Sequence, residues 1–204
     1  YIFLLLFLYY LKTRRFRNLV VCLSCLLCLG IYHTVMRWYD RPCPSLVFYN
    51  VRGCPAIHCI AEDGTSWLNY ADTLSDKRRL QAVAANYWRR HQLLPPIEVT
   101  ADCQNVDFCR HQQIVFYHGC RICMVTDNRW RNKSAASPLF INYMYLCKGY
   151  NGRLEELTGL FSPSCILLDA SLSDDRKQFF REECKRLHLH FITLSEEGSV
   201  RFLL

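Results

Sequence analysis

The chain has 204 residues, a formal net charge of +7 and 13 cysteines, and its length suits one domain of ordinary size. Five basic residues and no acidic residue precede Asp40, which leaves 25 − 5 = 20 basic residues against 18 acidic residues in the remainder. Residues 40–204 therefore carry a net charge of only +2. This distribution excludes a chain that is basic throughout, so net charge alone does not assign residues 40–204 to nucleic-acid binding.

Residues 1–38 have the composition of a membrane region. Residues 1–11 carry no charge, and residues 19–36 are 18 residues without a formal charge, close to the roughly 20 that span a bilayer core. We expect two transmembrane helices, the first truncated and the second at about residues 19–36. A signal peptide is less favoured because another apolar run comes first, and a buried soluble helix is less favoured because the segment is apolar on all sides.

The segment between these two runs predicts the orientation in the membrane. Residues 12–18, KTRRFRN, contain four positive charges and no negative charge, and short basic loops stay on the cytoplasmic side. We therefore expect a multi-pass membrane protein whose soluble domain, residues 40–204, lies outside the cytoplasm, which in a bacterium is the periplasm.

Apolar runs and turn signals alternate through the rest of the chain. The expected strands of the first half cover residues 45–51, 55–62, 66–71, 97–101, 112–118 and 121–127. The pattern predicts a helix over residues 74–91, with Ser75 as its N-cap, and its basic residues form two cationic spots, at 77–79 and 89–90. A polar loop follows at residues 127–138.

The second half has a different order of elements. Strands at 143–147, 165–170, 191–195 and 200–204 alternate with helices at 153–161 and 174–188, a βαβαββ pattern with parallel crossovers. Together the two halves predict an α/β layered domain with mixed sheets and outer helices.

The cysteines give no clear functional signal. Cys120 and Cys123 form a CxxC, but no second pair exists for a zinc knuckle. The pair lies in an expected strand, where residues i and i+3 point to opposite faces, unlike a thioredoxin-type site. Buried free cysteines are the favoured interpretation, and one or two periplasmic disulfides remain an alternative.

Several phrases recur in the order of a known family. They are NVRGCPA at 50–56, SWLNYAD at 66–72, CMVTD ending at Asp127, LCKGYNG at 146–152 and the close HFITLSEEGSVRFLL. In this order they resemble the C-terminal metallo-β-lactamase-like domain of ComEC-type competence proteins, the inner-membrane channels for DNA uptake. The resemblance covers essentially the whole chain and implies a metallo-β-lactamase-like domain preceded by transmembrane helices.

The residues that would hold metal in such a domain are missing. Where the family places two histidines between glycines, this chain has Tyr150 and Asn151, and the signature His-x-His-x-Asp-His is absent. Asp127 and Asp169 remain at strand ends, where a weak Mg²⁺ site is conceivable, but turn and helix capping is the favoured role. We therefore expect a degenerate domain with no catalytic residue, no metal and no cofactor. The single histidines are expected to be ordinary core or surface residues.

One loop has the composition of a single-strand binder. Arg129, Arg131 and Lys133 surround Trp130, and alternating cations with an aromatic suit phosphate pairing and base stacking. A solvated face with a partly buried tryptophan is the alternative.

The predicted function combines these points. The chain is expected to be the C-terminal, non-catalytic part of a competence-type DNA-uptake channel, with the membrane, single-stranded DNA and the channel upstream of residue 1 as partners. The alternative is a membrane-tethered, metal-dependent nuclease or phosphodiesterase with an unconventional site, because both classes fit the resemblance.

Overall fold

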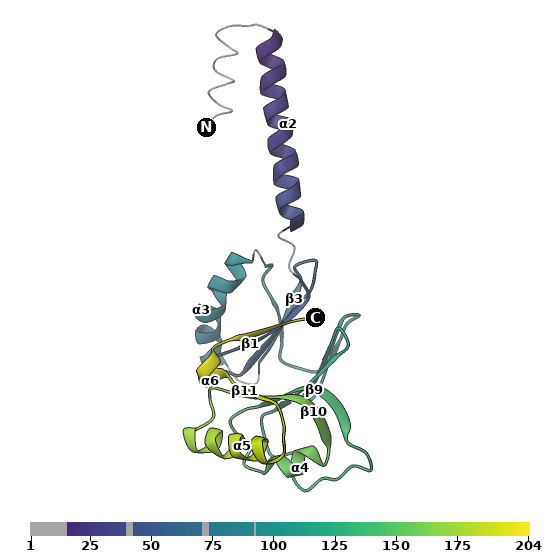
Figure 1. The fold of residues 1–204 in the computed structure, drawn as a ribbon, viewed down its shortest axis with the longest axis vertical. Helices are drawn as coiled ribbons and strands as arrows, with labels where there is room; N and C mark the ends of the chain where they lie inside the picture. The colour runs from purple at the N-terminus through teal and green to yellow at the C-terminus, as the bar shows by residue number, and fades with distance from the viewer. Residues whose placement is uncertain (1–15, 40–42, 71–73, 92) are drawn as a thin grey trace. The chain divides into compact units, whose positions relative to one another are not determined.

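The structure is a computed structural model, and it describes residues 16–39, 43–70, 74–91 and 93–204 (Figure 1). The chain divides into two compact units, Tyr1–Arg41 and Pro42–Leu204. Each unit is described by itself below.

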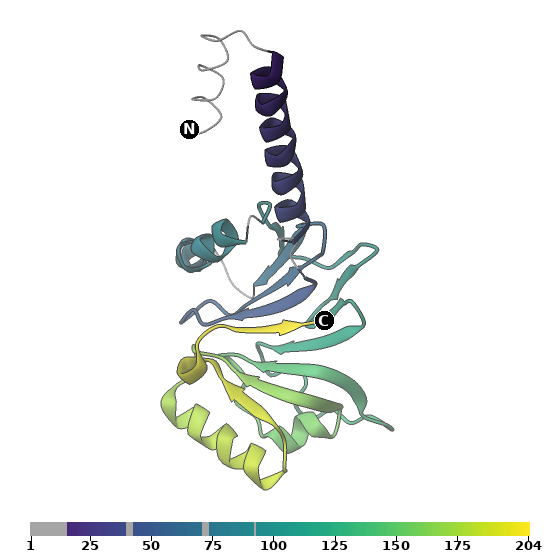
Figure 2. The same ribbon diagram turned by 45° about the horizontal axis from the view of Figure 1, so that its top comes forward.

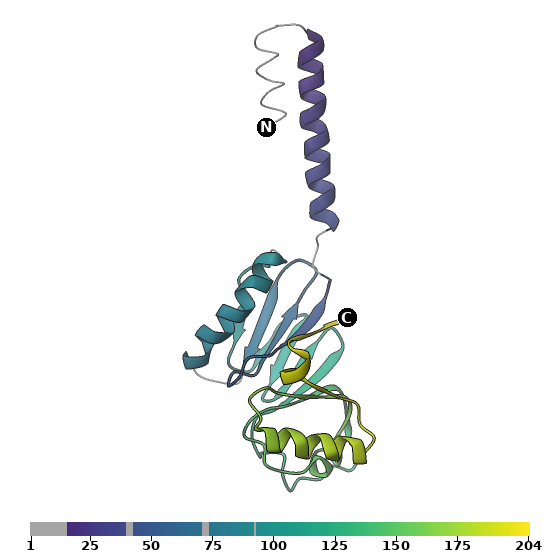
Figure 3. The same cartoon turned by 60° about the vertical axis from the view of Figure 1, so that its left-hand side comes forward.

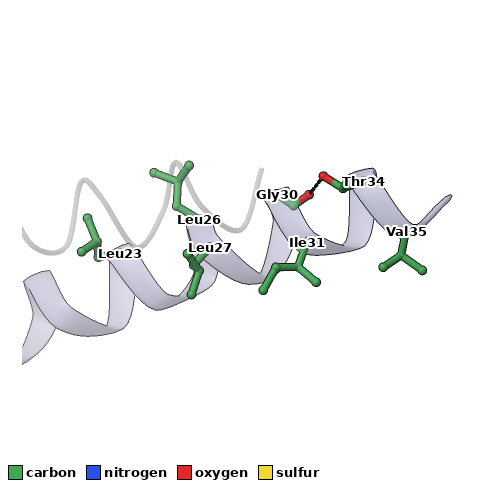
Figure 4. A pocket seen from close by; sticks show the side chains of 7 residues that line it. All are labelled: Leu23, Leu26, Leu27, Gly30, Ile31, Thr34 and Val35. Carbon is green, nitrogen blue, oxygen red and sulfur yellow. Dashed lines mark hydrogen bonds between the residues drawn. The ribbon is translucent and has the colours of Figure 1, made fainter. Parts of the chain in front are cut away.

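The first unit contains helix α2 (Phe16–Tyr39), which confirms the helix expected at residues 19–36. Its apolar side chains include Leu23 and Leu27, which are 65% and 67% exposed, and they border a shallow hollow along the helix (Figure 4). No helix in the described part of the chain combines the length and the apolar character needed to cross a bilayer. The predicted crossing at residues 19–36 is therefore not confirmed, and the first predicted span, residues 1–11, lies outside the described residues.

The second unit contains two sheets, and the smaller one has five strands within the described residues, in the order β12-β1-β2-β3-β4. Their bounds are Ser45–Tyr49 (β1), Ala56–Ile60 (β2), Ser66–Tyr70 (β3), Ile97–Val99 (β4) and Val200–Leu203 (β12). Strands β1, β2 and β3 form an antiparallel meander. Strand β4 then pairs parallel to β3, after helix α3 (Leu74–Arg90).

The larger sheet has seven strands within the described residues, in the order β11-β10-β9-β8-β7-β6-β5. Their bounds are Cys103–Gln104 (β5), Phe108–His111 (β6), Ile114–Tyr117 (β7), Cys120–Val125 (β8), Leu139–Leu146 (β9), Phe161–Leu168 (β10) and Phe191–Thr193 (β11). Strands β8 to β11 pair parallel to one another, whereas β5 to β8 are antiparallel. The parallel crossovers predicted for the second half of the chain are therefore confirmed for β9, β10 and β11.

Apolar side chains join these elements into layers. One buried cluster lies between the sheets and combines Phe48 of β1 with Tyr145 of β9, whose ring centroids are 5.4 Å apart. A second cluster packs the outer face of the larger sheet against α4 (Leu154–Thr158) and α5 (Asp174–Arg186). A third packs the outer face of the smaller sheet against α3. Figures 2 and 3 show this arrangement, with the sheets as inner layers and the helices outside. The predicted α/β class with mixed sheets and outer helices is confirmed, whereas the metallo-β-lactamase-like fold stays a prediction.

Some local expectations differ from the structure. Strands β5 and β6 were not expected, and helix α3 begins at Leu74, so Ser75 lies inside it and is not its N-cap. The strand expected at 191–195 ends earlier, at Thr193, and the short helix α6 (Leu194–Glu197) follows it. The predicted final strand forms as β12, which joins the smaller sheet beside β1.

Candidate functional site

The turn between β9 and α4, residues 149–152, is called the remnant turn below. It is the position at which the resemblance places metal-binding histidines. Gly149 has a φ of +115°, and a Cβ at this position would lie 2.3 Å from the carbonyl oxygen of Thr126. A Cβ on Gly152 would lie 2.3 Å from the hydroxyl oxygen of Tyr150. Both glycines are therefore required by the close packing of the turn itself.

Tyr150 belongs to the core. Its side chain is 1% exposed, its hydroxyl donates to the carbonyl of Arg153 at 2.7 Å, and its ring stacks on Phe180 with centroids 6.2 Å apart. Burial raises the pKa of the Tyr150 hydroxyl, which keeps it neutral. The neighbouring Asn151 is exposed, and its backbone N–H donates to the side-chain oxygen of Asn128 at 2.8 Å. This bond ties the turn to the start of the 128–133 loop.

Asp169 is fully buried after β10 and is bonded on both carboxylate oxygens. The hydroxyl of Tyr145 donates to Oδ1, and both the hydroxyl and the backbone N–H of Ser171 donate to Oδ2, the latter at 2.9 Å. Burial raises the pKa of Asp169 despite these bonds. These contacts are those of a loop anchor, because they fix the segment that leads into α5.

Asp127 is partly exposed after β8 and pairs with a cation two residues later. Its carboxylate accepts from the Arg129 guanidinium at 2.8 and 3.0 Å and from the Arg129 backbone N–H at 2.9 Å. Partial burial raises the pKa of Asp127, but the bonds to Arg129 outweigh this effect and hold the pKa below its usual value. The carboxylate closes a turn in the way expected of an aspartate at such a position.

These donor sets do not fit a hydrolytic metal centre. Two-metal hydrolysis needs several histidines and carboxylates around ions roughly 3.5–4 Å apart. Across the described ranges, no group of three or more His, Cys, Asp or Glu side chains is placed to hold a metal ion. Asp127 and Asp169 already accept bonds from the protein, and Tyr150 is directed into the core.

The 128–133 loop forms as predicted, but its side chains have partners within the domain. The indole N–H of Trp130 donates to Gln113 at 2.6 Å, and its ring meets Phe161 edge-on with centroids 5.1 Å apart. Arg131 lies 3.7 Å from a carboxylate oxygen of Glu156, and the ammonium of Lys133 lies 5.3 Å from the centroid of the Trp130 ring. Trp130 is thus an anchor for the loop. Nucleic-acid contact by Arg129, Arg131 and Lys133 stays a prediction.

Several cysteines and one histidine of the described residues belong to the core. Cys120 packs toward the cluster between the sheets and Cys123 toward the helical side, so the CxxC points to opposite faces as predicted. Cys120 and Cys123 are free thiols, and burial raises the pKa of Cys123 to about 12. His58 is fully buried on β2, where its Nδ1 and the Tyr49 hydroxyl share a hydrogen bond of 2.8 Å. The expectation that a single histidine on an apolar strand is a core residue is confirmed for His58.

A cationic hollow beside the remnant turn was not predicted. Its volume is about 530 Å³, and its lining includes Arg52, Arg79, Lys148 and Arg176. These residues come from the β1–β2 turn, from α3, from the turn after β9 and from α5, so no spacing in the sequence groups them. The sequence held a partial indication of this hollow, because Arg52 lies in the phrase NVRGCPA and Lys148 in the phrase LCKGYNG, two of the phrases on which the resemblance rests.

The fold and this site define an α/β domain with two mixed sheets between helices and a glycine turn that lacks metal ligands. The family model of the ComEC C-terminal domain matches residues 46–204, and the chain therefore belongs to the ComEC C-terminal domain family. Membership associates the chain with competence-type DNA uptake at a membrane. No curated protein and no solved structure matches the chain significantly.

Proposed function

We propose that residues 42–204 are a non-catalytic domain of a competence-type DNA-uptake channel and that the domain contacts single-stranded DNA near the membrane pore. The observation that carries this proposal is the family match over residues 46–204, combined with the chemistry of the remnant turn. Tyr150, Asp127 and Asp169 are each engaged in hydrogen bonds within the protein, which supports a domain in which these residues do not hold a metal that activates water.

The domain is proposed to lie outside the cytoplasm. The support is the basic segment at residues 12–17, which precedes the domain, together with the membrane association of the family. Alkaline phosphatase, which matures only in the periplasm, can be fused after Leu204 in a chain that keeps residues 1–41. An active fusion is expected, and a well-expressed but inactive fusion would contradict this location.

Activity assays separate this function from the nuclease alternative. The chain is incubated with single- and double-stranded DNA and with added Zn²⁺, Mn²⁺ or Mg²⁺, and binding is measured in parallel. We expect binding of single strands without cleavage. Metal-dependent cleavage that Asp127→Ala or Asp169→Ala abolishes would refute the non-catalytic proposal and support the nuclease.

A further inference from the structure

We propose that the cationic hollow beside the remnant turn binds the phosphodiester groups of single-stranded nucleic acid. This inference rests on the proposed function and assigns DNA contact to a specific site. The site consists of Arg52, Arg79, Lys148 and Arg176 around the turn that contains Gly149.

The charges of this hollow are not neutralised within the described part of the chain. Among the residues that the structure describes, no carboxylate forms an ion pair with Arg52, Arg79, Lys148 or Arg176, and no acidic side chain lines the hollow. Arg129 and Lys77 differ from these four residues, because Arg129 pairs with Asp127 at 2.8 Å and Lys77 pairs with Glu98 at 2.7 Å. Four cations held in one concave site without counter-charges create a strong positive potential, which favours an anionic ligand.

Arg176 is fixed in position at one wall of the hollow. Its guanidinium donates to the carbonyl of Gly152 at 2.9 Å and lies over the rings of Phe179 and Phe180, at 4.8 and 4.4 Å from their centroids. Its Nε is buried and has no hydrogen-bond partner. A guanidinium that is already ordered loses little conformational freedom when it binds a phosphate, which is the advantage of arginine for this task.

The other polar groups of the site also favour an anion. Ser173 caps the N-terminus of the 13-residue helix α5, and this end of the helix carries the positive part of its dipole. The Ser173 oxygen accepts from the backbone N–H of Arg176 at 3.4 Å, so its hydroxyl hydrogen is available to a ligand. Ser171 and Asn151 also line the hollow.

The lining favours a nucleic-acid backbone over a phospholipid surface. Surfaces that dock on membranes combine cations with exposed apolar side chains that insert among the lipids. None of the exposed large apolar residues lies in this hollow, and its aromatic residue, Tyr150, is buried. The absence of an exposed aromatic ring also means that no base stacks here, so binding should not depend on base sequence.

A triple substitution with a matched control tests this site. The chain with Arg52→Ala, Arg79→Ala and Lys148→Ala is compared with the chain carrying Arg78→Ala, Arg89→Ala and Arg90→Ala, which removes the same charge from α3 outside the hollow. Arg176 is left unchanged because it supports the turn. Binding of a dye-labelled 20-nucleotide poly-dT is followed by fluorescence anisotropy from 50 to 400 mM NaCl, and a thermal melt checks that both variants are folded.

For single strands, each phosphate contact adds roughly 0.7 to the steepness with which the logarithm of the binding constant falls against the logarithm of the salt concentration. Loss of three contacts should therefore reduce this slope by about 2. At 0.1 M salt this corresponds to roughly 100-fold weaker binding for the hollow variant, with a much smaller change for the control. Poly-dA should behave as poly-dT does.

The other outcomes overturn the inference at different levels. If both variants bind equally well, the hollow is not the site, although DNA binding by the domain stands. If the unchanged chain binds no DNA, both this site and DNA contact by the domain fail. If the unchanged chain instead binds phosphatidylglycerol vesicles, and the hollow variant loses that binding, then the ligand is a lipid headgroup and the nucleic-acid assignment is wrong.

Discussion

Acidification should destabilise the domain through His58, which is buried beneath α3. Burial lowers the pKa of His58 from 6.5 to about 3. The Tyr49 hydroxyl accepts from the Trp88 indole N–H at 3.1 Å and shares a hydrogen bond of 2.8 Å with Nδ1 of His58, a bond that the neutral imidazole can make in either tautomer. The Nε2 atom is buried and has no partner that could stabilise a positive charge.

The sign and size of the effect follow from proton linkage. Between pH 3 and pH 6.5 the unfolded chain binds a proton at His58 that the folded chain does not, so the free energy of unfolding falls as the pH falls. The slope approaches about 1.4 kcal/mol per pH unit, which gives a loss of about 2 kcal/mol between pH 7 and pH 5. The stabilisation is fully present above pH 6.5.

Urea unfolding of the chain at pH 7 and pH 5 measures this loss, and His58→Asn isolates it. The asparagine amide can replace Nδ1 as the partner of the Tyr49 hydroxyl but does not titrate. The free energy of unfolding of the variant should therefore fall by about 2 kcal/mol less than that of the unchanged chain over this interval. His111→Asn is the control, because the His111 side chain is 77% exposed. Equal pH dependence in the unchanged chain and in His58→Asn would refute the assignment of a neutral, buried imidazole.

Three further substitutions test the description of the site. Trp130→Ala should lower the free energy of unfolding by about 2 kcal/mol, about half the value of a fully buried tryptophan, because the ring anchors the loop on Phe161. Gly149→Ala should lower the free energy of unfolding by about 3 kcal/mol or more, since the new Cβ meets a carbonyl oxygen at 2.3 Å. Gly64→Ala is the control: Gly64 also has a positive φ but has open space around it, so this change should lower the free energy of unfolding by only about 1–2 kcal/mol. Asp169→Asn should lower the free energy of unfolding by about 1–3 kcal/mol, because an amide has one acceptor oxygen and cannot accept from both Tyr145 and Ser171 on its two sides.

Chemical denaturation followed by circular dichroism measures all of these changes. A Trp130→Ala chain that is as stable as the unchanged one, but binds single-stranded DNA about 1–3 kcal/mol more weakly, would restore the stacking role first considered for this loop. Equal losses for Gly149→Ala and Gly64→Ala would contradict the close packing at the remnant turn. An Asp169→Asn chain with unchanged stability but altered metal affinity would contradict the anchor role.

The larger elements could be predicted from local patterns, whereas the site could not. The strands that became β1, β2 and β3 are mainly apolar runs between turn signals, and such runs are reliable because these strands are buried along their whole length. Strands β5 and β6 are short, with partly exposed side chains, so they have neither continuous nor alternating apolar character. In the fold, β6 pairs with β7 and β5 pairs with β6.

The cationic residues show the same limit of prediction from local sequence patterns. Arg129 and Arg131 are close in sequence to an aromatic residue, which predicted a binding loop, yet their charges are partly neutralised by Asp127 and Glu156. Lys148 and Arg79 are far apart in sequence and are brought together only by the packing of α3 and the turn after β9 around the hollow. Charge in a sequence can be counted, but whether it has a counter-ion depends on tertiary contacts.

The pairing of β12 with β1 has a consequence for synthesis of the domain. Val200 to Leu203 are paired with Phe48 to Ser45, and the backbone N–H of Leu204 donates to the carbonyl of Pro44 at 3.0 Å. The edge of β1 therefore stays open on the ribosome until residues 200–204 have emerged, since an unpaired edge strand can pair with other chains. A nascent or truncated chain that lacks these residues would expose the edge of a buried apolar strand, and chaperones and proteases can act on such an exposed edge.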